Sequence, residues 1–230
     1  MVQGVLRGRL VLLRHGQTVW SETGQYTGRT DIPLTQTGCI QAKDAGKRIR
    51  EFLAGPGAGA SAAFHVYVSP LKRAQDTAQL AGLGEYTVDD GLAEFDYGPA
   101  EGRTRSQVAK AIGEKTWNIW DRGPLTLPSA LQGIRHEMLP EYGEITINNG
   151  VGESAEMAAT RTRQVIQRAV PALEAGEDVI CVAHAHILRI LATQWLGLPP
   201  EAARMFELGT AHFCVLSWHH EDRVISGWNL

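Results

Sequence analysis

The chain has 230 residues, a formal net charge of −3 and 43% hydrophobic residues, which suits a globular protein with one substantial core rather than two full domains. It has no basic tract, so the composition argues against nucleic acid as a partner. The first apolar run is too short for a signal peptide or a membrane span, and we therefore expect a cytoplasmic protein with no membrane partner.

The three cysteines are scattered along the chain at Cys39, Cys181 and Cys214. The number is odd, and two of the three lie in apolar runs. This pattern predicts buried free thiols in a reducing compartment rather than a disulfide framework.

The first predicted element is a strand at residues 10–13, Leu-Val-Leu-Leu, which runs directly into Arg14, His15 and Gly16. A short unbroken apolar run is typical of a strand buried on both faces of a parallel sheet. Ligands of such sheets bind beyond the carboxyl ends of the strands. A cation and an imidazole at this point indicate that something anionic binds there.

The next predicted elements are a helix over residues 35–54, with Thr35 as its N-cap, and a glycine-rich loop at residues 55–60. Residues 64–68 form a second predicted strand. The segment after it places Arg73 near the start of a helix that runs to about residue 81.

The last third of the chain continues the alternation of helices and strands. An amphipathic helix is predicted over residues 153–175, with an i+4 series at Met157, Arg161, Val165, Ala169 and Leu173. A buried strand at 178–183 leads into an apolar helix over 187–196, and residues 213–218 and 223–228 read as a closing hairpin. This alternation indicates an α/β fold.

Histidines and arginines follow several of these strands, with His184 and His186 after the strand at 178–183. If the strands are neighbours in one parallel sheet, two arginines and two histidines converge on one rim. Arginine binds phosphate oxygens in a bidentate fashion, so the cluster predicts a phosphate pocket. A zinc site of His15, His184 and His186 is the alternative, but no acidic or cysteine partner has suitable spacing, and we expect no metal and no cofactor.

The motifs continue well beyond these residues. They are residues 14–21 (Arg-His-Gly-Gln-Thr-Val-Trp-Ser), 24–28 (Gly-Gln-Tyr-Thr-Gly), 34–38, 69–74 (Ser-Pro-Leu-Lys-Arg-Ala), 92–98 (Leu-Ala-Glu-Phe-Asp-Tyr-Gly), 101–102, 152–154 (Gly-Glu-Ser) and 183–184. Their content and order resemble the histidine phosphatase superfamily, also called phosphoglycerate mutase-like. The resemblance covers roughly residues 9–218 and implies a single domain over residues 1–230. The implied fold is a three-layer α/β/α sandwich with a mostly parallel central sheet.

The resemblance implies a catalytic role for five residues. His15 would be the nucleophile that takes the phosphoryl group, and Glu94 the general acid that protonates the leaving oxygen. The phosphate oxygens would be held by Arg14, Arg73 and His184. Asp96, two residues after Glu94, is a rival for the acid because both side chains lie on one side of an extended segment.

Seven further residues are expected to bind substrate or phosphate: Ser21, Gln25, Thr27, Gly28, Glu153, Ala185 and His186. Ser21 stands where several mutases carry asparagine. Ala185 stands where the family usually has glycine, and an alanine would be strained there if the backbone required a positive φ. Glu153 is expected to order histidine or arginine side chains near the pocket. The Gly-Glu-Ser phrase lacks the Gly-x-Ser-x-Gly elbow of a serine hydrolase.

Residues 99–150 resemble the family least, and we expect them to form a cap or lid insertion. The part from 124 to 149 looks longer than in relatives, has three prolines and shows no clear period, which favours a lid or an oligomer arm. The edge strand near the carboxyl terminus could pair in a homodimer.

The expected function is that of a metal-independent phosphomonoesterase, with a small sugar phosphate or related phosphorylated metabolite as its partner. The phrases at 24–28, 117–120 and 183–189 most resemble the sedoheptulose-1,7-bisphosphatase and acid phosphatase branch. Mutases usually carry Asn-Glu-Arg-His-Tyr-Gly where this chain has Ala-Glu-Phe-Asp-Tyr-Gly at 93–98. Two alternatives stay open: a cofactor-dependent phosphoglycerate mutase, and a non-catalytic member that binds a phosphorylated ligand.

Overall fold

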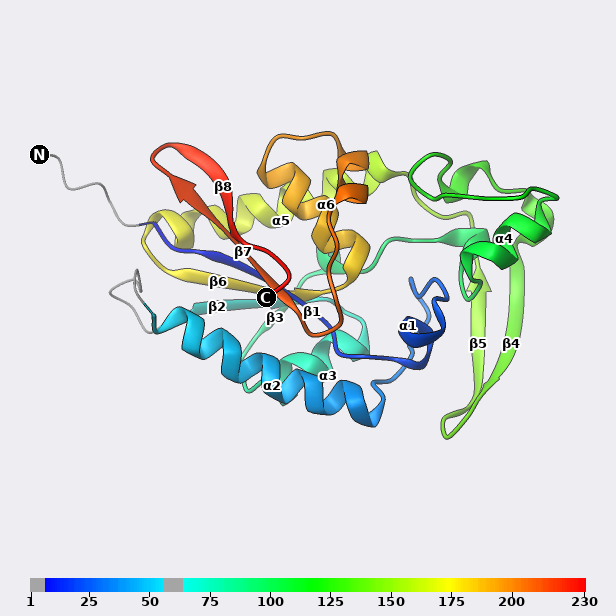
Figure 1. Ribbon diagram of the computed structural model, residues 1–230, viewed down its shortest axis with the longest axis horizontal. Helices are drawn as coiled ribbons and strands as arrows, with labels where there is room; N and C mark the ends of the chain where they lie inside the picture. Colours follow the sequence, from blue (N-terminus) through cyan, green and yellow to red (C-terminus); the bar gives the residue numbers. More distant parts are fainter. Residues whose placement is uncertain (1–6, 56–63) are drawn as a thin grey trace, which may run out of the picture.

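A six-stranded sheet forms the centre of the computed structural model, which describes residues 7–55 and 64–230 (Figure 1). Most of the predicted loop at 55–60 lies outside the described residues. The strand order is β3-β2-β6-β1-β7-β8. The strands are β1 (Leu10–Arg14), β2 (Phe64–Val68), β3 (Thr87–Val88), β6 (Asp178–Ala183), β7 (Phe213–His219) and β8 (Asp222–Gly227). The first four in the order β3-β2-β6-β1 are parallel, and β7 and β8 are antiparallel.

The register of the sheet brings the functional motifs together. Leu10 pairs with Val179 and Arg14 pairs with Ala183 across the parallel β1 and β6. The residues that follow each strand, His15 and His184, therefore leave the sheet side by side at the same edge. This confirms the predicted convergence of the two strand exits.

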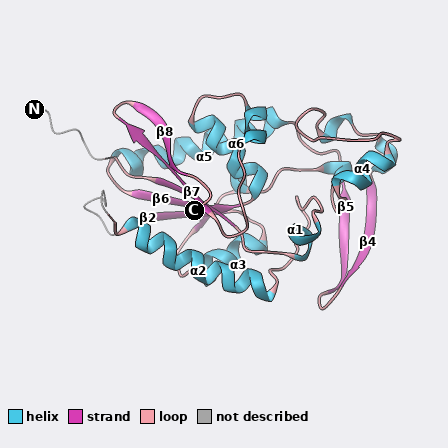
Figure 2. Cartoon of the chain, viewed as in Figure 1, coloured by secondary structure: helices cyan, strands magenta, loops and turns pink. Residues whose placement is uncertain are grey.

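Helices cover both faces of the sheet (Figure 2). One face packs against α2 (Gln36–Leu53) and α3 (Lys72–Leu80), and the other against α5 (Ala155–Glu174) and α6 (Ala185–Trp195). Successive residues of β1 alternate between the two cores, with Leu12 on the α5 and α6 side and Val11 on the α2 and α3 side. Both faces of β1 are buried, which is why its sequence is a continuous apolar run. The predicted three-layer α/β/α fold is confirmed.

The predicted cap of α2 is confirmed, and α5 begins two residues later than predicted, after a serine cap that the sequence analysis did not single out. Thr35 accepts a hydrogen bond from Gly38 N and begins α2, and Ser154 does the same for α5 through Met157 N. The predicted apolar face of α5 is wrong at its first position, because Met157 is 55% exposed while Val165 is buried. The buried stripe instead begins at Ala158.

A separate lobe lies beyond one end of the sheet (Figure 1). It contains η2 (Gly98–Ala100), α4 (Arg105–Ala111), η3 (Pro124–Thr126), η4 (Ser129–Leu131) and an antiparallel hairpin of β4 (Gly133–Leu139) and β5 (Gly143–Asn149). The hairpin was not expected. Its strands bury only a few side chains, Leu139 and Ile147 among them, so no apolar period marks them. These two pack with Trp20 and Ile32 against α1 (Val19–Thr23).

The remaining short elements are η1 (Asp90–Leu92) and η5 (Pro200–Met205). The closing hairpin of β7 and β8 matches its prediction, and β8 lies at the edge of the sheet. All three cysteines are free, with Cys181 and Cys214 buried and Cys39 half-buried. Within residues 7–55 and 64–230, no helix combines the length and apolar character needed to cross a bilayer.

Candidate active site

A cavity of about 170 Å³ opens where β1 ends. Its walls come from the β1 exit, α1 and the loop after it, the segment around residue 94, and the start of α6. The lining residues are Arg14, His15, Trp20, Ser21, Gly24, Gln25, Tyr26, Thr27, Glu94, Tyr97 and His186. Seven predicted site residues therefore line this cavity: Arg14, His15, Ser21, Gln25, Thr27, Glu94 and His186.

His15 is held in one tautomer by its own neighbour. Its Nδ1 lies 2.7 Å from the carbonyl oxygen of Gly16, and because a carbonyl only accepts, Nδ1 carries the proton. Nε2 is thus left with its lone pair. Burial, reinforced by the charges of Arg73 and Arg14, holds the pKa of His15 well below 6.5, so the ring is neutral and suited to nucleophilic attack.

Arg14 brings a buried charge with an unused donor to the same cavity. Its Nη1 donates to the carbonyl of Leu208 at 2.7 Å. Its Nε is buried and has no acceptor within the described parts of the chain. Burial lowers the pKa of Arg14, yet an arginine side chain stays charged in proteins. Since buried donors are almost always paired, this site fits an anion that supplies the missing acceptor.

Arg73 and His184 form the layer directly behind His15. Arg73 is fully buried, and its Nε donates to His184 Nδ1 at 3.1 Å. Its Nη atoms donate to backbone carbonyls of the loop between α1 and α2, at residues 27, 28 and 30. The Nε2 of His184 lies 2.7 Å from Ser69 Oγ, and the rings of His15 and His184 are 5.1 Å apart between centroids. Neither residue is among those lining the cavity, so their direct contact with phosphate oxygens stays a prediction.

The protonation of His184 follows from its partners. The guanidinium of Arg73 only donates, so His184 Nδ1 accepts and its Nε2–H donates to Ser69. Burial and the charge of Arg73 hold the pKa of His184 well below 6.5. Both histidines of the pair are therefore neutral at neutral pH.

Glu94 lines the cavity from the segment between η1 and η2, and it contacts the start of α6. Its carboxylate accepts hydrogen bonds from the backbone N–H groups of Phe95 (2.8 Å), Ile187 (3.0 Å) and His186 (3.2 Å). The rival Asp96 instead accepts from Gly98 N and does not line the cavity. Of the two carboxylates, the structure places Glu94 at the site.

His186 lines the cavity from the first turn of α6. Its Nδ1 is 2.8 Å from the hydroxyl of Tyr97, and its ring stacks on Trp120 with centroids 5.0 Å apart. Burial and the charge of Arg189 hold the pKa of His186 well below 6.5. The Tyr97 pKa is raised well above 10.0 by burial and by the charge of Glu94, so this hydroxyl keeps its proton.

The loop predicted to bind substrate divides into two parts. Ser21, Gln25 and Thr27 line the cavity, and Ser21 Oγ also caps α1 by accepting from Thr18 N. Gly28 lies behind them, where a Cβ would come within 2.5 Å of Glu101 Oε2, so no larger residue fits without movement.

Ala185 and Glu153 differ from the expectations. Ala185 is the first residue of α6 and is not among the residues with a positive φ, so alanine fits there without strain. Glu153 does not line the cavity and forms an ion pair with Arg161 at 2.6 Å. Arg161 donates in turn to the carbonyls of Ala93 and Glu94, so Glu153 acts on the site only through the backbone that carries Glu94. The ion pair fits the expectation that Glu153 orders an arginine side chain near the pocket, and a contact of Glu153 with substrate stays a prediction.

The sequence reasoning missed two contributors to the site. Tyr97 lies inside the quoted 92–98 motif, yet nothing in the pattern gave it a role. Glu101 is buried and accepts from Gly28 N at 2.9 Å and Thr30 N at 3.0 Å, and burial raises its pKa to about 7. The only sequence feature that pointed to Glu101 was its place in the 101–102 motif.

Within the described residues, no group of three or more His, Cys, Asp or Glu side chains is placed to hold a metal ion.

The proteins that are similar in sequence include both phosphatases and mutases. The chain is 33% identical over 224 residues to an acid phosphatase of Mycobacterium tuberculosis, with 97% of this chain and 93% of the relative covered. It is 32% identical to the sedoheptulose 1,7-bisphosphatase of Saccharomyces cerevisiae, with 84% and 69% covered. It is 30% identical to a 2,3-bisphosphoglycerate-dependent phosphoglycerate mutase of Gloeobacter violaceus, with 92% and 85% covered.

A solved structure from Mycobacterium tuberculosis has the same fold. It superposes with a TM-score of 0.77 at 31% identity and covers 97% of each chain. The family model of the histidine phosphatase superfamily (branch 1) matches residues 10–230, which include the strand exits, the cavity and the closing hairpin. The chain therefore belongs to the histidine phosphatase superfamily.

Proposed function

We propose that the chain is a phosphomonoesterase that needs no metal ion and hydrolyses a small sugar phosphate or related metabolite through a phosphohistidine at His15. The observation that carries this proposal is the pairing of a neutral His15, whose Nε2 has its lone pair, with a buried Arg14 Nε that lacks an acceptor within the described residues. A phosphate at this position would satisfy Arg14 and face the nucleophile.

The proposed reaction has two in-line transfers. With Glu94 protonated at the start of the cycle, His15 Nε2 attacks phosphorus, the bond to the ester oxygen breaks, and Glu94 gives its proton to the leaving alkoxide. Water then attacks the phosphorus of phospho-His15, Glu94 takes the proton, and the N–P bond breaks to release inorganic phosphate. The cationic Arg14 and Arg73 offset the negative charge on the transferring group.

Hydrolysis is favoured over mutase chemistry by the segment after Glu94. Where mutases usually carry Arg-His, this chain has Phe95 and Asp96; Phe95 is buried in the core, and Asp96 accepts a backbone hydrogen bond from Gly98. This segment therefore adds no cation to hold a second acidic group of a phosphoglycerate. The acid phosphatase and sedoheptulose bisphosphatase relatives support the same choice.

Phosphate release tests the proposal. The wild-type protein and His15→Ala are assayed with EDTA present, against a panel of sugar phosphates, sugar bisphosphates and 3-phosphoglycerate. We expect release from sugar phosphates by the wild type and a loss of at least about 10⁴-fold in His15→Ala, because removal of an activated nucleophile has an effect of this size. The variant's circular dichroism spectrum should match that of the wild type.

Three results would contradict the proposal. Retained turnover in His15→Ala would exclude a phosphohistidine at this residue. Isomerised phosphoglycerate that depends on added 2,3-bisphosphoglycerate would identify a mutase. Binding of the phosphorylated compounds without turnover would identify a non-catalytic member of the family.

A further inference from the structure

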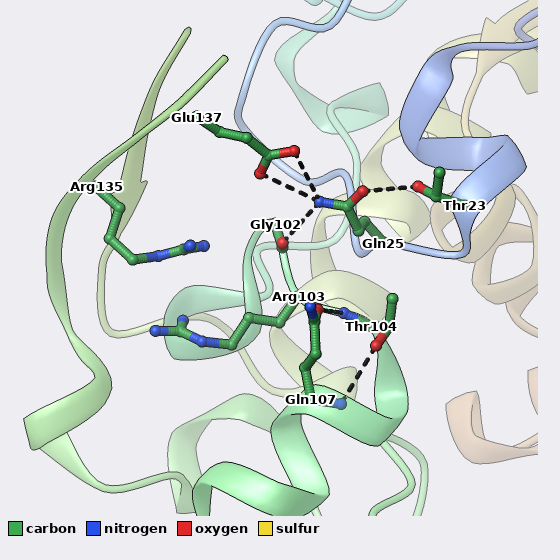
Figure 3. A pocket seen from close by; sticks show the side chains of 8 residues that line it. All are labelled: Thr23, Gln25, Gly102, Arg103, Thr104, Gln107, Arg135 and Glu137. Carbon is green, nitrogen blue, oxygen red and sulfur yellow. Dashed lines mark hydrogen bonds between the residues drawn. The ribbon is translucent and has the colours of Figure 1, made fainter. Parts of the chain in front are cut away.

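A second and larger cavity, of about 520 Å³, shares Gln25 with the first, and its lining side chains are shown in Figure 3. It is enclosed by the end of α1, the segment that leads into α4, and the inner side of β4. The lining residues are Thr23, Gln25, Gly102, Arg103, Thr104, Gln107, Arg135 and Glu137. Gln25 lines both cavities, so the two share this side chain as a wall.

Two arginines on one side of this cavity lack acidic partners. No Asp or Glu oxygen of the described residues lies within ion-pair distance of Arg103 or Arg135. Arg135 is fixed by hydrogen bonds from its Nε to Asn149 Oδ1 and from its Nη2 to the Glu101 carbonyl, both 2.8 Å. Arg103 Nη1 donates to the Pro99 carbonyl. Arg103 Nε and Nη2, and Arg135 Nη1, have no acceptor among the described residues.

The two guanidinium groups are close enough to disfavour each other. Burial and the neighbouring charge of Arg135 lower the pKa of Arg103. Like charges in a half-buried site are unfavourable unless an anion lies between or beside them. Unpaired guanidinium N–H groups are matched to phosphate or carboxylate oxygens.

The cavity also contains a carboxylate, because Glu137 lies on the same strand as Arg135, and neutral hydrogen-bonding groups face both of them (Figure 3). Glu137 accepts from Trp20 Nε1 at 3.2 Å and from Gln25 Nε2 at 3.3 Å. The Gln25 amide also donates to the Gly102 carbonyl and accepts from the Thr23 hydroxyl. Thr23 and Gln25 suit hydroxyl groups, and the Glu137 carboxylate accepts from Trp20 and Gln25, which leaves the unpaired N–H groups of Arg103 and Arg135 for an anion.

We propose that this second cavity binds the second phosphate of a bisphosphorylated polyol whose first phosphate faces His15. The inference rests on the proposed function and adds the substrate class to it. The hydroxyl-bearing carbon chain of such a substrate would pass Gln25 from one cavity to the other. Arg103 and Arg135 would then determine specificity without touching the reacting phosphorus.

Selectivity between matched substrates tests this proposal. Hydrolysis of fructose 1,6-bisphosphate and sedoheptulose 1,7-bisphosphate is compared with that of p-nitrophenyl phosphate, which has no second anion. In Arg103→Gln, we expect the ratio of kcat/KM for a bisphosphate to kcat/KM for p-nitrophenyl phosphate to fall about tenfold, the size of one charge-assisted hydrogen bond. The fall should come from KM, and Arg103→Lys should restore part of it.

Lys110→Gln is the matched control, because Lys110 is an exposed cation of α4 that does not line the cavity. It removes the same charge and should leave the ratio as it is in the wild type. An equal fall in Lys110→Gln would assign the effect to overall charge. An unchanged ratio in Arg103→Gln would overturn the proposal. Inhibition of the enzyme by added sulfate is measured on the same variant. If Arg103→Gln loses only this inhibition, Arg103 belongs to a separate anion site, and the proposal is overturned as well.

Calorimetry separates this inference from the proposed function. Binding of fructose 1,6-bisphosphate and fructose 6-phosphate is measured on His15→Ala. This variant is used because a binding measurement does not require turnover. Tighter binding of the bisphosphate, lost on adding Arg103→Gln, supports the second site even if the wild type hydrolyses neither compound. Equal affinities would overturn the second site while p-nitrophenyl phosphate hydrolysis by the wild type still supported the phosphatase.

Discussion

The rings of His15 and His184 lie 5.1 Å apart between centroids, and the guanidinium groups of Arg14 and Arg73 lie close to both. The charges of Arg14 and Arg73 disfavour protonation of both rings, so each histidine keeps one N–H and one lone pair. The two guanidinium groups lie near the carboxyl groups of Glu94 and, on the Arg73 side, Glu101. A bound phosphate would add negative charge beside these guanidinium groups and so stabilise their charged form.

Glu94→Gln tests the proposed acid at the residue scale. The amide keeps an oxygen for the N–H groups of Phe95 and Ile187 but cannot supply a proton to the leaving group. We expect kcat for a sugar phosphate to fall about 10²–10⁴-fold. The fall should be much smaller for p-nitrophenyl phosphate, whose leaving group needs little protonation.

Asp96→Asn is the control for this variant, because Asp96 only accepts from Gly98 N. It should leave both rates within about twofold, since surface substitutions of this kind have small effects. A larger loss in Asp96→Asn than in Glu94→Gln would reverse the assignment of the acid.

At the scale of elements, the exit of β1 is set by its close approach to α2. A Cβ on Gly16 would lie 2.3 Å from the carbonyl oxygen of Gly38, and a Cβ on Gly38 would lie 2.1 Å from that of Gln17. The backbone at residues 16–17 and the backbone of Gly38 are therefore in direct contact, and neither can move without displacing the other. The first turn of α2 thus holds the backbone next to His15 in place.

Gly38→Ala should therefore damage stability and activity together. The overpacked contact should cost about 1–3 kcal/mol, which corresponds to about 2–4 °C in Tm for each kcal/mol. The value of kcat/KM should fall because Gln17 lies two residues from His15. Gly150→Ala is the matched control, since a Cβ there meets no atom within 4 Å and the φ of Gly150 is not positive. Equal Tm values for the two variants would refute the contact argument.

The sequence was most informative where burial leaves a pattern. β1 and β6 are buried on both faces, so their apolar runs predicted the sheet, its edge and the meeting of His15 with His184. Thr35 predicted the start of α2 because a helix cap is a local interaction. The hairpin of β4 and β5 was not predicted, because nearly all its side chains are at least partly exposed and leave no apolar pattern in the sequence.

The site was harder to predict wherever a contact depends on tertiary packing. The Leu208 carbonyl that fixes Arg14 comes from the backbone and has no side-chain signal. Glu153 was expected to order histidine or arginine side chains near the pocket, but the sequence did not indicate which one, and its partner is Arg161, eight residues later. The family motifs thus predicted which residues surround the cavity better than what each one touches.

At the scale of the whole molecule, buried titratable groups link stability to pH in two opposite directions. Three histidines, His15, His184 and His186, have pKa values held well below 6.5 by burial and by nearby arginines. They contribute stability that is present above pH 6.5 and is lost as the pH falls, because the unfolded chain binds their protons more readily. Glu101 has its pKa raised from 4.5 to about 7, so its contribution is present below pH 4.5 and is lost as the pH rises through 7.

The histidines outnumber the glutamate, so the free energy of unfolding should decrease between pH 6.5 and pH 5, as measured by urea denaturation. Each neutral histidine adds up to about 1.4 kcal/mol per pH unit to this slope while its folded form resists protonation. His15→Asn should make the decrease shallower, and Glu101→Gln should make it steeper because the opposing carboxyl is gone. His136→Asn, at an exposed position of β4, should leave the slope as in the wild type. A wild-type stability that stays level or rises between pH 6.5 and pH 5 would show that these histidines are protonated in the folded protein.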